Sequence, residues 1–142
     1  MQCIIATNQA HFYDQILIRK EVFIIEQQVP INEEFDDLDK TAIQFVVYDN
    51  ELAVGAARFR TVAHKGKVER VCVLKSYRKK GVGKLLMDTI EHFASKQGDI
   101  TTLVLSAQLT ALSFYQKLGY QGYGDIYLDA NIKHQAMDKP LL

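Results

Sequence analysis

The chain has 142 residues, 48% of them hydrophobic and 24% charged, which is the composition of one compact globular domain and excludes a disordered chain. Seventeen lysines and arginines balance seventeen aspartates and glutamates, and this zero formal charge argues against a nucleic-acid partner. No apolar run reaches the ~20 residues of a membrane helix, and the start lacks the features of a signal peptide. We therefore expect a single domain over residues 1–142, with no membrane partner and a cytoplasmic location.

The first part of the chain predicts a short strand followed by a helix. Residues 2–6 are strand-like, and Asn8 can cap the helix because its side chain accepts a hydrogen bond from a first-turn N–H. The helix either continues through residues 22–25 or breaks and restarts, and it ends before Pro30. The polar, acidic residues 31–40 predict a loop or a short irregular helix.

The middle of the chain predicts a hairpin, a buried strand and a long helix. Residues 43–49 and 52–60 are rich in strand formers and flank the turn residues Asp49 and Asn50. Residues 68–74 read as a buried strand. The helix spans residues 81–97, because its apolar positions fall on one face.

The last part of the chain predicts a strand over residues 101–105 and a helix over residues 107–118, which Gly119 ends. Two short strands follow, near residues 120–123 and 131–137. The sequence of elements predicts a mixed α/β (α+β) fold with an antiparallel start, a β-α-β unit and a late antiparallel return. An exposed sheet edge at the C-terminal strands could support a homodimer.

The two cysteines, Cys3 and Cys72, lie far apart in the sequence and form no C-x-x-C pair. They provide neither a disulfide framework nor the spacing of a metal site. We interpret them as buried free thiols and expect no metal.

Residues 68–84 carry the chemistry, because they join a strand, a basic turn with two glycines and an amphipathic helix. The N–H groups of a first helical turn lack internal partners and lie at the positive end of the helix dipole. Glycines let a phosphate approach the backbone closely. The segment therefore predicts an anion site, to which four side chains add positive charge: Arg78, Lys79, Lys80 and Lys84.

Two nucleotide motifs do not fit this turn. A Walker A loop would need glycine where Arg78 stands and serine or threonine where Leu85 stands. A dinucleotide fingerprint would need glycine at Leu86 and a place after the first strand of the sheet. A small NTPase is thus disfavoured, and the plain alternative is a glycine-rich turn with solvated lysines.

Two motifs resemble those of the GCN5-related N-acetyltransferases, the GNAT family. Residues 78–83 (Arg-Lys-Lys-Gly-Val-Gly) are similar to its Arg/Gln-x-x-Gly-x-Gly/Ala signature, and residues 71–74 to its core strand. Residues 111–120 (Ala-Leu-Ser-Phe-Tyr-Gln-Lys-Leu-Gly-Tyr) are similar to a second signature, Ala-x-x-Phe-Tyr-x-Lys-x-Gly-Phe/Tyr. The resemblance extends over essentially the whole chain, and residues 19–27 and 134–137 resemble a small bacterial subgroup, mostly of unassigned substrate.

The resemblance implies a GNAT fold: a mixed, mostly antiparallel sheet with splayed parallel strands at the cofactor cleft and about four flanking helices. It implies an acyl-CoA-dependent N-acyltransferase that moves acetyl from acetyl-CoA to a primary amine, of a small molecule or a protein, by direct attack. The alternative is a module that binds acyl-CoA without turnover. The resemblance implies that backbone groups of Val71, Cys72 and Val73 pair with the pantetheine arm. It further implies that the turn holds the pyrophosphate, through Arg78, Lys79, Lys80, Gly81, Val82, Gly83 and Lys84.

The reaction needs a base for the amine and a proton donor for the leaving thiolate. The resemblance implies Tyr115 as the donor, whereas helical periodicity alone also fits a core aromatic residue. Glu69 is the candidate base, and its plain alternative is a strand glutamate paired with a lysine. Simple alternation puts Glu69 on the face of Val71 and Val73, which predicts a buried carboxylate or a strand irregularity. His134 is a second candidate base, whereas Cys72 has no motif that places a base beside it.

The zero net charge divides into two opposed segments. Residues 58–84 hold ten lysines and arginines against one acid, and residues 21–39 hold seven acids and no lysine or arginine. The basic segment coincides with the predicted phosphate turn. Residues 21–39 form either a rim that attracts a cationic amine or a solvated loop.

Overall fold

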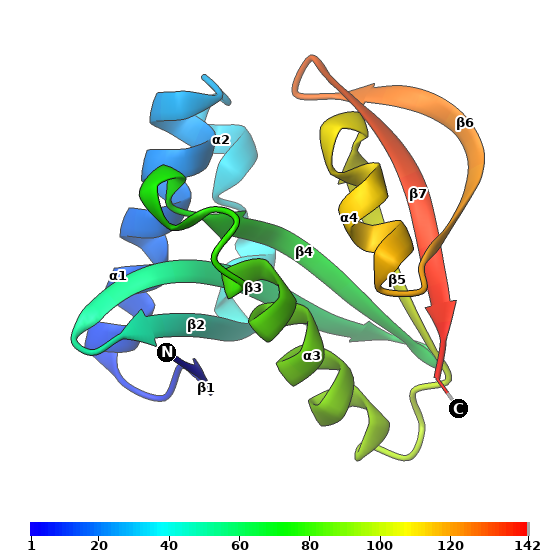
Figure 1. The fold of residues 1–142 in the computed structure, drawn as a ribbon, viewed down its shortest axis with the longest axis horizontal. Helices are drawn as coiled ribbons and strands as arrows, with labels where there is room; N and C mark the ends of the chain where they lie inside the picture. The colour runs from blue at the N-terminus through cyan, green and yellow to red at the C-terminus, as the bar shows by residue number, and fades with distance from the viewer. Residues whose placement is uncertain (142) are drawn as a thin grey trace.

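The computed structural model describes residues 1–141, which form one mixed sheet with helices on both faces (Figure 1). Within these residues the strands are β1 (Gln2–Ile5), β2 (Ile43–Asp49), β3 (Leu52–Val62), β4 (Lys65–Val73), β5 (Thr102–Gln108), β6 (Gln121–Asp129) and β7 (Ile132–Pro140). The helices are α1 (Gln9–Arg19), α2 (Ile31–Glu34), α3 (Val82–Ser95) and α4 (Leu112–Lys117). A π-helix, η1 (Lys20–Glu26), follows α1, and three short 3-10 turns complete the chain: η2 (Asp37–Lys40), η3 (Lys75–Tyr77) and η4 (Leu109–Ala111).

The strand order of the sheet is β1-β2-β3-β4-β5-β7-β6. Only β4 and β5 pair in parallel in the described chain, and every other neighbouring pair is antiparallel. This arrangement confirms the expected mixed, mostly antiparallel sheet. None of the helices in residues 1–141 is long and apolar enough to cross a membrane.

The first helix begins where the sequence predicts. The Oδ1 atom of Asn8 accepts a hydrogen bond from the N–H of His11 at 2.9 Å and caps α1. The helix does not break after Arg19 but continues as the π-helix η1, which ends when the N–H of Gln27 bonds the carbonyl of Val22 at 3.2 Å. Residues 31–40, called the acidic segment below, form the short helical turns α2 and η2, as expected.

The predicted helix over residues 107–118 is wrong at its start. Ala107 and Gln108 belong to β5, where they pair with Gln135 and His134 of β7, and α4 begins at Leu112. Pairing with a strand distant in the sequence outweighs the local helical spacing of the apolar residues. The two predicted short strands are in fact one long hairpin, β6–β7.

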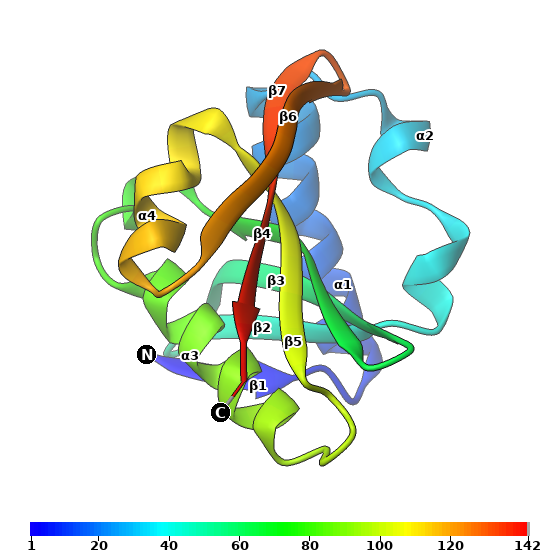
Figure 2. The same ribbon diagram turned by 90° about the vertical axis from the view of Figure 1, so that its right-hand side faces the viewer.

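Two layers of helices cover the sheet, with α3 and α4 on one face and α1 and α2 on the other (Figure 2). The larger core lies beneath α3 and α4, and a smaller one lies beneath α1 and η1. Buried members of the larger core include Phe45, Phe59, Val68, Leu86, Ile90, Leu103 and Met137, and those of the smaller one include Ile18, Val22, Val46, Ala56 and Cys72.

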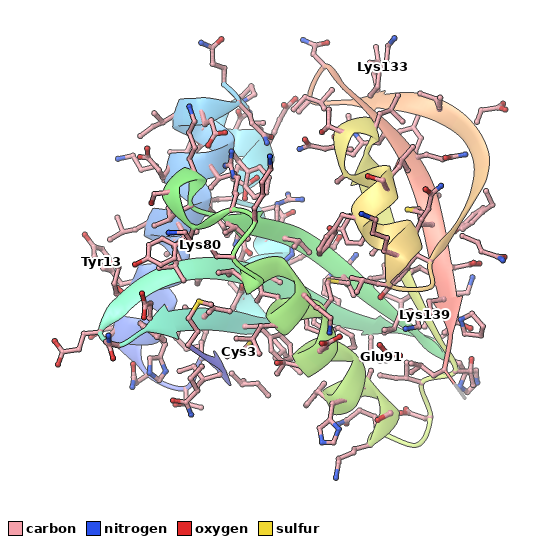
Figure 3. The ribbon with its side chains drawn as sticks, in the orientation of Figure 1. Cys3, Tyr13, Lys80, Glu91, Lys133 and Lys139 are labelled. Atoms are coloured by element: carbon pink, nitrogen blue, oxygen red, sulfur yellow. The ribbon has the colours of Figure 1, made fainter. Side chains whose placement is uncertain are left out.

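The parallel strands β4 and β5 are paired at one end and separate at the other (Figure 1). Their pairing runs from Lys65 opposite Thr102 to Val68 opposite Leu105 and stops there. The sheet is therefore split from residue 69 onward. Near the paired end, an ion pair joins Lys139 of β7 to Glu91 of α3, whose Nζ and Oε1 atoms lie 2.9 Å apart (Figure 3).

A β-bulge interrupts β4 at the point where this split begins. Glu69 pairs with Arg58 and Cys72 with Ala56, so β4 has one residue more than β3 in this stretch. Arg70, in the bulge, has the left-handed φ of 57°. The extra residue reverses the alternation, so Glu69 faces the α1 side and lies on the opposite face from Val71 and Val73. The expected strand irregularity is confirmed, and simple alternation was wrong for Glu69.

Candidate functional site

A cleft of about 810 Å³ occupies the gap between β4 and β5. On the α3–α4 side it is lined by the start of α3 and by α4, and on the α1 side by η1 and by side chains of β6 and β7. Residues 67–73 of β4 form its central wall. Because the sheet is split here, the cleft passes from one face of the sheet to the other.

The open edge of β4 presents backbone groups to this cleft. The N–H of Leu74 bonds the carbonyl of Val54 on β3 at 2.9 Å. Successive residues of a strand direct their N–H and C=O groups to opposite edges, so Val73 directs its own toward the gap. Its carbonyl accepts a hydrogen bond from Nε of Arg78 at 3.0 Å, and its N–H faces the cleft.

The start of α3 presents to the cleft backbone N–H groups that have no partners in the described part of the chain. Gly81 adopts the left-handed φ of 85°, and no side chain caps the helix. No hydrogen-bond partner exists within residues 1–141 for the N–H groups of Val82, Gly83 and Lys84. A Cβ atom on Gly81 would meet nothing within 4 Å, so the approach to these donors is open. Three free donors at the positive end of a 14-residue helix favour a phosphate group.

The basic side chains of this turn are partly paired. Arg78 donates from Nη1 and Nη2 to Glu26 at 2.6 and 2.7 Å, and this hydrogen bond lowers the pKa of Glu26. Lys84 pairs with Asp88 at 2.6 Å. Of the residues expected to hold a cofactor, all line the cleft except Lys80, whose ammonium lies over the ring of Tyr77.

Tyr115 of α4 lines the cleft and is 7% exposed. Its hydroxyl has no hydrogen-bond partner within residues 1–141. In this part of the chain, the one side-chain nitrogen or oxygen that is both fully buried and without a partner is Oε1 of Gln44, so the Tyr115 hydroxyl is not fully buried. The hydroxyl of Tyr115 therefore keeps contact with the cleft. Burial raises the pKa of Tyr115, which keeps the phenol protonated and able to donate a proton.

Glu69 also lines the cleft, on the α1 side of the sheet. Its Oε1 atom accepts hydrogen bonds from Nε of Arg60 at 2.7 Å and from Nε of Arg58 at 3.2 Å. Burial alone would raise the pKa of Glu69, but these two arginines outweigh it and hold the pKa below its usual range. Glu69 is thus an ionised carboxylate and a weak base, and its role as the base remains a prediction.

Two buried arginines hold the acidic segment against the rest of the domain through ion pairs. Arg19 is wholly buried and bonds Glu34 Oε2 and Asp39 Oδ1, each at 2.7 Å. Arg58, 1% exposed, bonds Asp36 Oδ1 at 2.7 Å and Asp39 Oδ1 at 3.1 Å. These carboxylates therefore neutralise arginines and do not form a free acidic rim. The sequence feature that could have predicted this pairing is Arg58, a charged residue within the otherwise apolar strand at residues 52–60.

His134 lies on β7, lines the cleft and is 9% exposed. Its Nδ1 atom is 2.6 Å from the carbonyl oxygen of Ile132. Its ring stacks on that of Tyr127, with centroids 6.0 Å apart, and the Tyr127 hydroxyl hydrogen-bonds Ser106 of β5. The ring is thus held in one orientation at the α1 side of the cleft.

The cysteines are free, as expected, although Cys3 is only partly buried. Burial raises the pKa of Cys72 to about 12, which keeps its side chain a thiol and does not support an acyl-cysteine. No cluster of three or more His, Cys, Asp or Glu side chains suited to a metal occurs among residues 1–141.

Comparisons with known proteins agree on one family. The model of the acetyltransferase (GNAT) domain matches residues 8–141. The chain is 43% identical over 140 residues to the "Uncharacterized N-acetyltransferase YjcF" of Bacillus subtilis (strain 168), which covers 98% of this chain and 99% of that protein. The chain therefore belongs to the GNAT acetyltransferase family.

Solved structures support the same assignment. A candidate N-acetyltransferase from Lactobacillus plantarum matches with a TM-score of 0.92 and 28% identity, over 99% of this chain and 98% of that one. An aminoglycoside 6′-N-acetyltransferase complexed with coenzyme A matches with a TM-score of 0.75 over 100% and 98% of the two chains; at 16% identity it shows the fold alone. The fold is the GNAT fold, and the chain is an acyl-CoA-dependent N-acetyltransferase enzyme.

Proposed function

We propose that the enzyme transfers acetyl from acetyl-CoA to a primary amine by direct attack within the cleft. The observation that carries this proposal is the split between β4 and β5, which opens one cleft to both faces of the sheet. We call the α3–α4 side of the cleft the cofactor side and the α1 side the acceptor side. Two substrates that enter from opposite faces can meet without a covalent enzyme intermediate, and much of the rate comes from holding them together.

The residues of the cofactor side fit coenzyme A. The free N–H groups of Val82, Gly83 and Lys84 would hold the pyrophosphate. Val71 and Val73, on the open edge of β4, would pair with the pantetheine arm. Cys72 lies between them and pairs with Ala56 of β3. Bound acetyl-CoA supplies the acetyl group as a reactive thioester.

Tyr115 would donate a proton to the departing sulfur, and the N–H of Val73 would stabilise the negative charge that develops on the thioester oxygen. The raised pKa of Tyr115 keeps its proton available across the neutral range. A thiol has an ordinary pKa of about 8.5 and leaves fairly well unaided, so Tyr115 assists and is not indispensable.

On the acceptor side, the Glu69 carboxylate, although paired with Arg58 and Arg60, would accept a hydrogen bond from the ammonium group of a small molecule or a protein. The proposal also includes a homodimer through β6, an edge strand whose residues Tyr123, Ile126 and Leu128 are exposed. Light scattering on the purified protein measures its mass directly. A monomer at micromolar concentration would contradict the dimer and leave the enzymatic proposal intact.

Cofactor binding is tested by thermal shift with acetyl-CoA, coenzyme A, ATP and NAD. We expect the melting temperature to rise with the first two and not with the others, because ligands that bind the native state stabilise it. The absence of a shift with both CoA species would contradict the proposed cofactor site.

Turnover is tested by thiol release from acetyl-CoA with spermidine, glucosamine, L-lysine and a lysine-containing peptide. Tyr115→Phe should lower kcat roughly 10–100-fold, at or below the usual range for a general acid, because thiolates leave readily. Tyr120→Phe is the matched control, since Tyr120 is a buried tyrosine with its ring 5.9 Å from that of Tyr115 and does not line the cleft. Unimpaired turnover in Tyr115→Phe would remove its acid role. Binding of acetyl-CoA with no amine consumed would favour the binding module.

A further inference from the structure

The proposed transfer needs a group that accepts a proton from the amine, and Glu69 and His134 both line the acceptor side. Glu69 is bonded to Arg58 and Arg60, which stabilise its ionised form. Even without such partners, a glutamate (ordinary pKa ~4.3) accepts a proton about a hundredfold less readily than an imidazole (~6.5). An alkyl ammonium, near ~10.4, is a weak acid, so the stronger base has the clear advantage.

The contacts of His134 determine which of its nitrogens is free. The Nδ1 atom lies 2.6 Å from the carbonyl oxygen of Ile132, and a carbonyl oxygen only accepts, so Nδ1 carries the hydrogen. The neutral ring then has its lone pair on Nε2. Nε2 has no partner in the described chain and is not among its fully buried unpartnered atoms, so it is open to the cleft.

The position of His134 in the sheet places this nitrogen on the acceptor side. Met137, three residues along β7, is buried in the core beneath α3 and α4, so alternation directs His134 to the α1 face. Its partner on β5, Gln108, donates from Nε2 to Oε1 of Gln27 at 2.9 Å, next to the end of η1. Tyr115 reaches the cleft from α4, on the other face.

The groups around His134 hold its ring and leave Nε2 free. Tyr127 of β6 stacks on the ring and uses its hydroxyl for Ser106 of β5. The other charged groups of these elements that line the cleft carry both signs, and no ion pair joins any of them to His134 within residues 1–141. They are Asp129 of β6, Lys67, Glu69 and Arg70 of β4, and Glu33 and Glu34 of α2.

We infer that His134 is the general base of the acetyl transfer, an inference that rests on the proposed function. Nε2 of His134 accepts a proton from the bound ammonium and later releases it to solvent. The nitrogen of the substrate amine, now neutral, then forms a bond to the carbonyl carbon of the thioester. The carbon–sulfur bond breaks, and its electron pair stays on sulfur. Tyr115 gives its proton to that sulfur and regains one from the nitrogen of the newly acetylated amine. The products are the amide, free coenzyme A and the one proton that His134 releases.

The pH dependence of kcat/KM separates the two candidate bases. His134→Asn is the central variant, because the asparagine amide nitrogen can replace Nδ1 as the donor to Ile132 while Nε2 is lost. We expect kcat/KM to fall about 100-fold, within the usual range for a general base. We also expect the acid limb of the profile to disappear, because the group assigned to it is removed. Glu69→Gln should keep that limb and raise KM instead.

Two further variants test whether the effect is chemical. His134→Gly should recover activity when imidazole is added to the buffer, because a free base can enter the vacated space. His64→Asn is the matched control, since Nδ1 of His64 also lies near a carbonyl, that of Asp99 at 3.0 Å, but His64 is exposed and outside the cleft. It should leave activity and its pH profile unchanged.

The inference is overturned if His134→Asn keeps the acid limb, if Glu69→Gln loses it, or if imidazole does not restore His134→Gly. The acetyl-CoA thermal shift should be the same in all these variants, which checks that the cofactor side is intact. If the unaltered enzyme binds acetyl-CoA and acetylates no amine, the proposed function fails first, and the inference fails with it.

Discussion

The two sides of the cleft differ in the groups that they present, which are chiefly backbone on one side and side chains on the other. The cofactor side consists chiefly of backbone: the free N–H groups at the start of α3 and the open edge of β4 at Val73. The acceptor side consists of side chains from β4, β5, β6, β7, η1 and α2, and buried arginines lie behind them. Every residue type other than proline has an N–H, so a backbone site tolerates substitution, whereas a side-chain site depends on partners distant in the sequence. If the proposed function holds, binding of acetyl-CoA should therefore depend less on side-chain substitutions than binding of the acceptor does.

The largest effect on stability should come from Arg19→Met. This change leaves Glu34 and Asp39 short of the positive charge that compensates them in a buried site, which typically costs about 3–5 kcal/mol. Urea unfolding measures the free energy of unfolding. Arg78→Met is the control: Arg78 and Glu26 are 37% and 34% exposed, and a pair of that kind contributes about 0–1 kcal/mol. Equal losses of stability in the two variants would contradict the view that the buried arginine stabilises the fold more than the partly exposed one.

Acidification should weaken the same arginine network. Burial alone would raise the pKa of Asp39, but Arg19 and further hydrogen bonds lower it from 3.8 to about 2. Because the folded pKa is the lower one, the stabilisation is complete above pH ~5 and is lost as the pH falls from ~4 toward 2. It amounts to about 2 kcal/mol.

Urea unfolding of the Asp39→Asn variant across this pH range tests whether the acid sensitivity comes from Asp39. The variant should lose about 2 kcal/mol at pH 7 and show a flatter acid dependence. Asp37→Asn is the control, since Asp37 is fully exposed and its one ion pair, to Lys40, is 3.9 Å long. If the free energy of unfolding of Asp39→Asn depended on acid as it does in the unaltered protein, the sensitivity would come from another group.

The smallest change in free energy is expected on the cofactor side, from Lys84→Glu. A carboxylate at the start of α3 would repel a pyrophosphate, and we expect the Kd for acetyl-CoA to rise about tenfold, or ~1.4 kcal/mol. Stability should hardly change, because an acid in a first helical turn is favourable and offsets its repulsion from Asp88. Lys96→Glu, at the other end of the helix, should leave the Kd unchanged. Calorimetric titration measures both, and equal effects would show general electrostatics rather than a local site.

The same contrast explains what could be predicted from the sequence. The elements of the proposed cofactor side could be predicted because they are contiguous: a strand, a glycine turn and a helix within residues 68–84. The family motifs occupy one segment each, and the fold follows from their order. Tyr115 was found in the same way, and it does reach the cleft.

The acceptor side was not predictable because its pairs span long distances along the chain. Opposed charge in residues 21–39 and 58–84 was visible, but the pairing of Asp36 with Arg58 depends on where the acidic segment folds against β3. The start of α4 was missed for a related reason, since the ladder to β7 fixes Ala107 and Gln108 as strand. Local spacing carries no information about such distant partners.

The bulge at Arg70 has a consequence for how such an enzyme can diverge. It divides β4 into two segments whose side-chain alternation is set independently. Glu69, at the end of the first segment, bonds the buried arginine Arg58, and residues from Val71 onward form the edge proposed to bind the cofactor. A substitution in one segment leaves the alternation of the other undisturbed. Selection can therefore act on acceptor choice and on cofactor binding as separate traits, although both are encoded in one strand of nine residues.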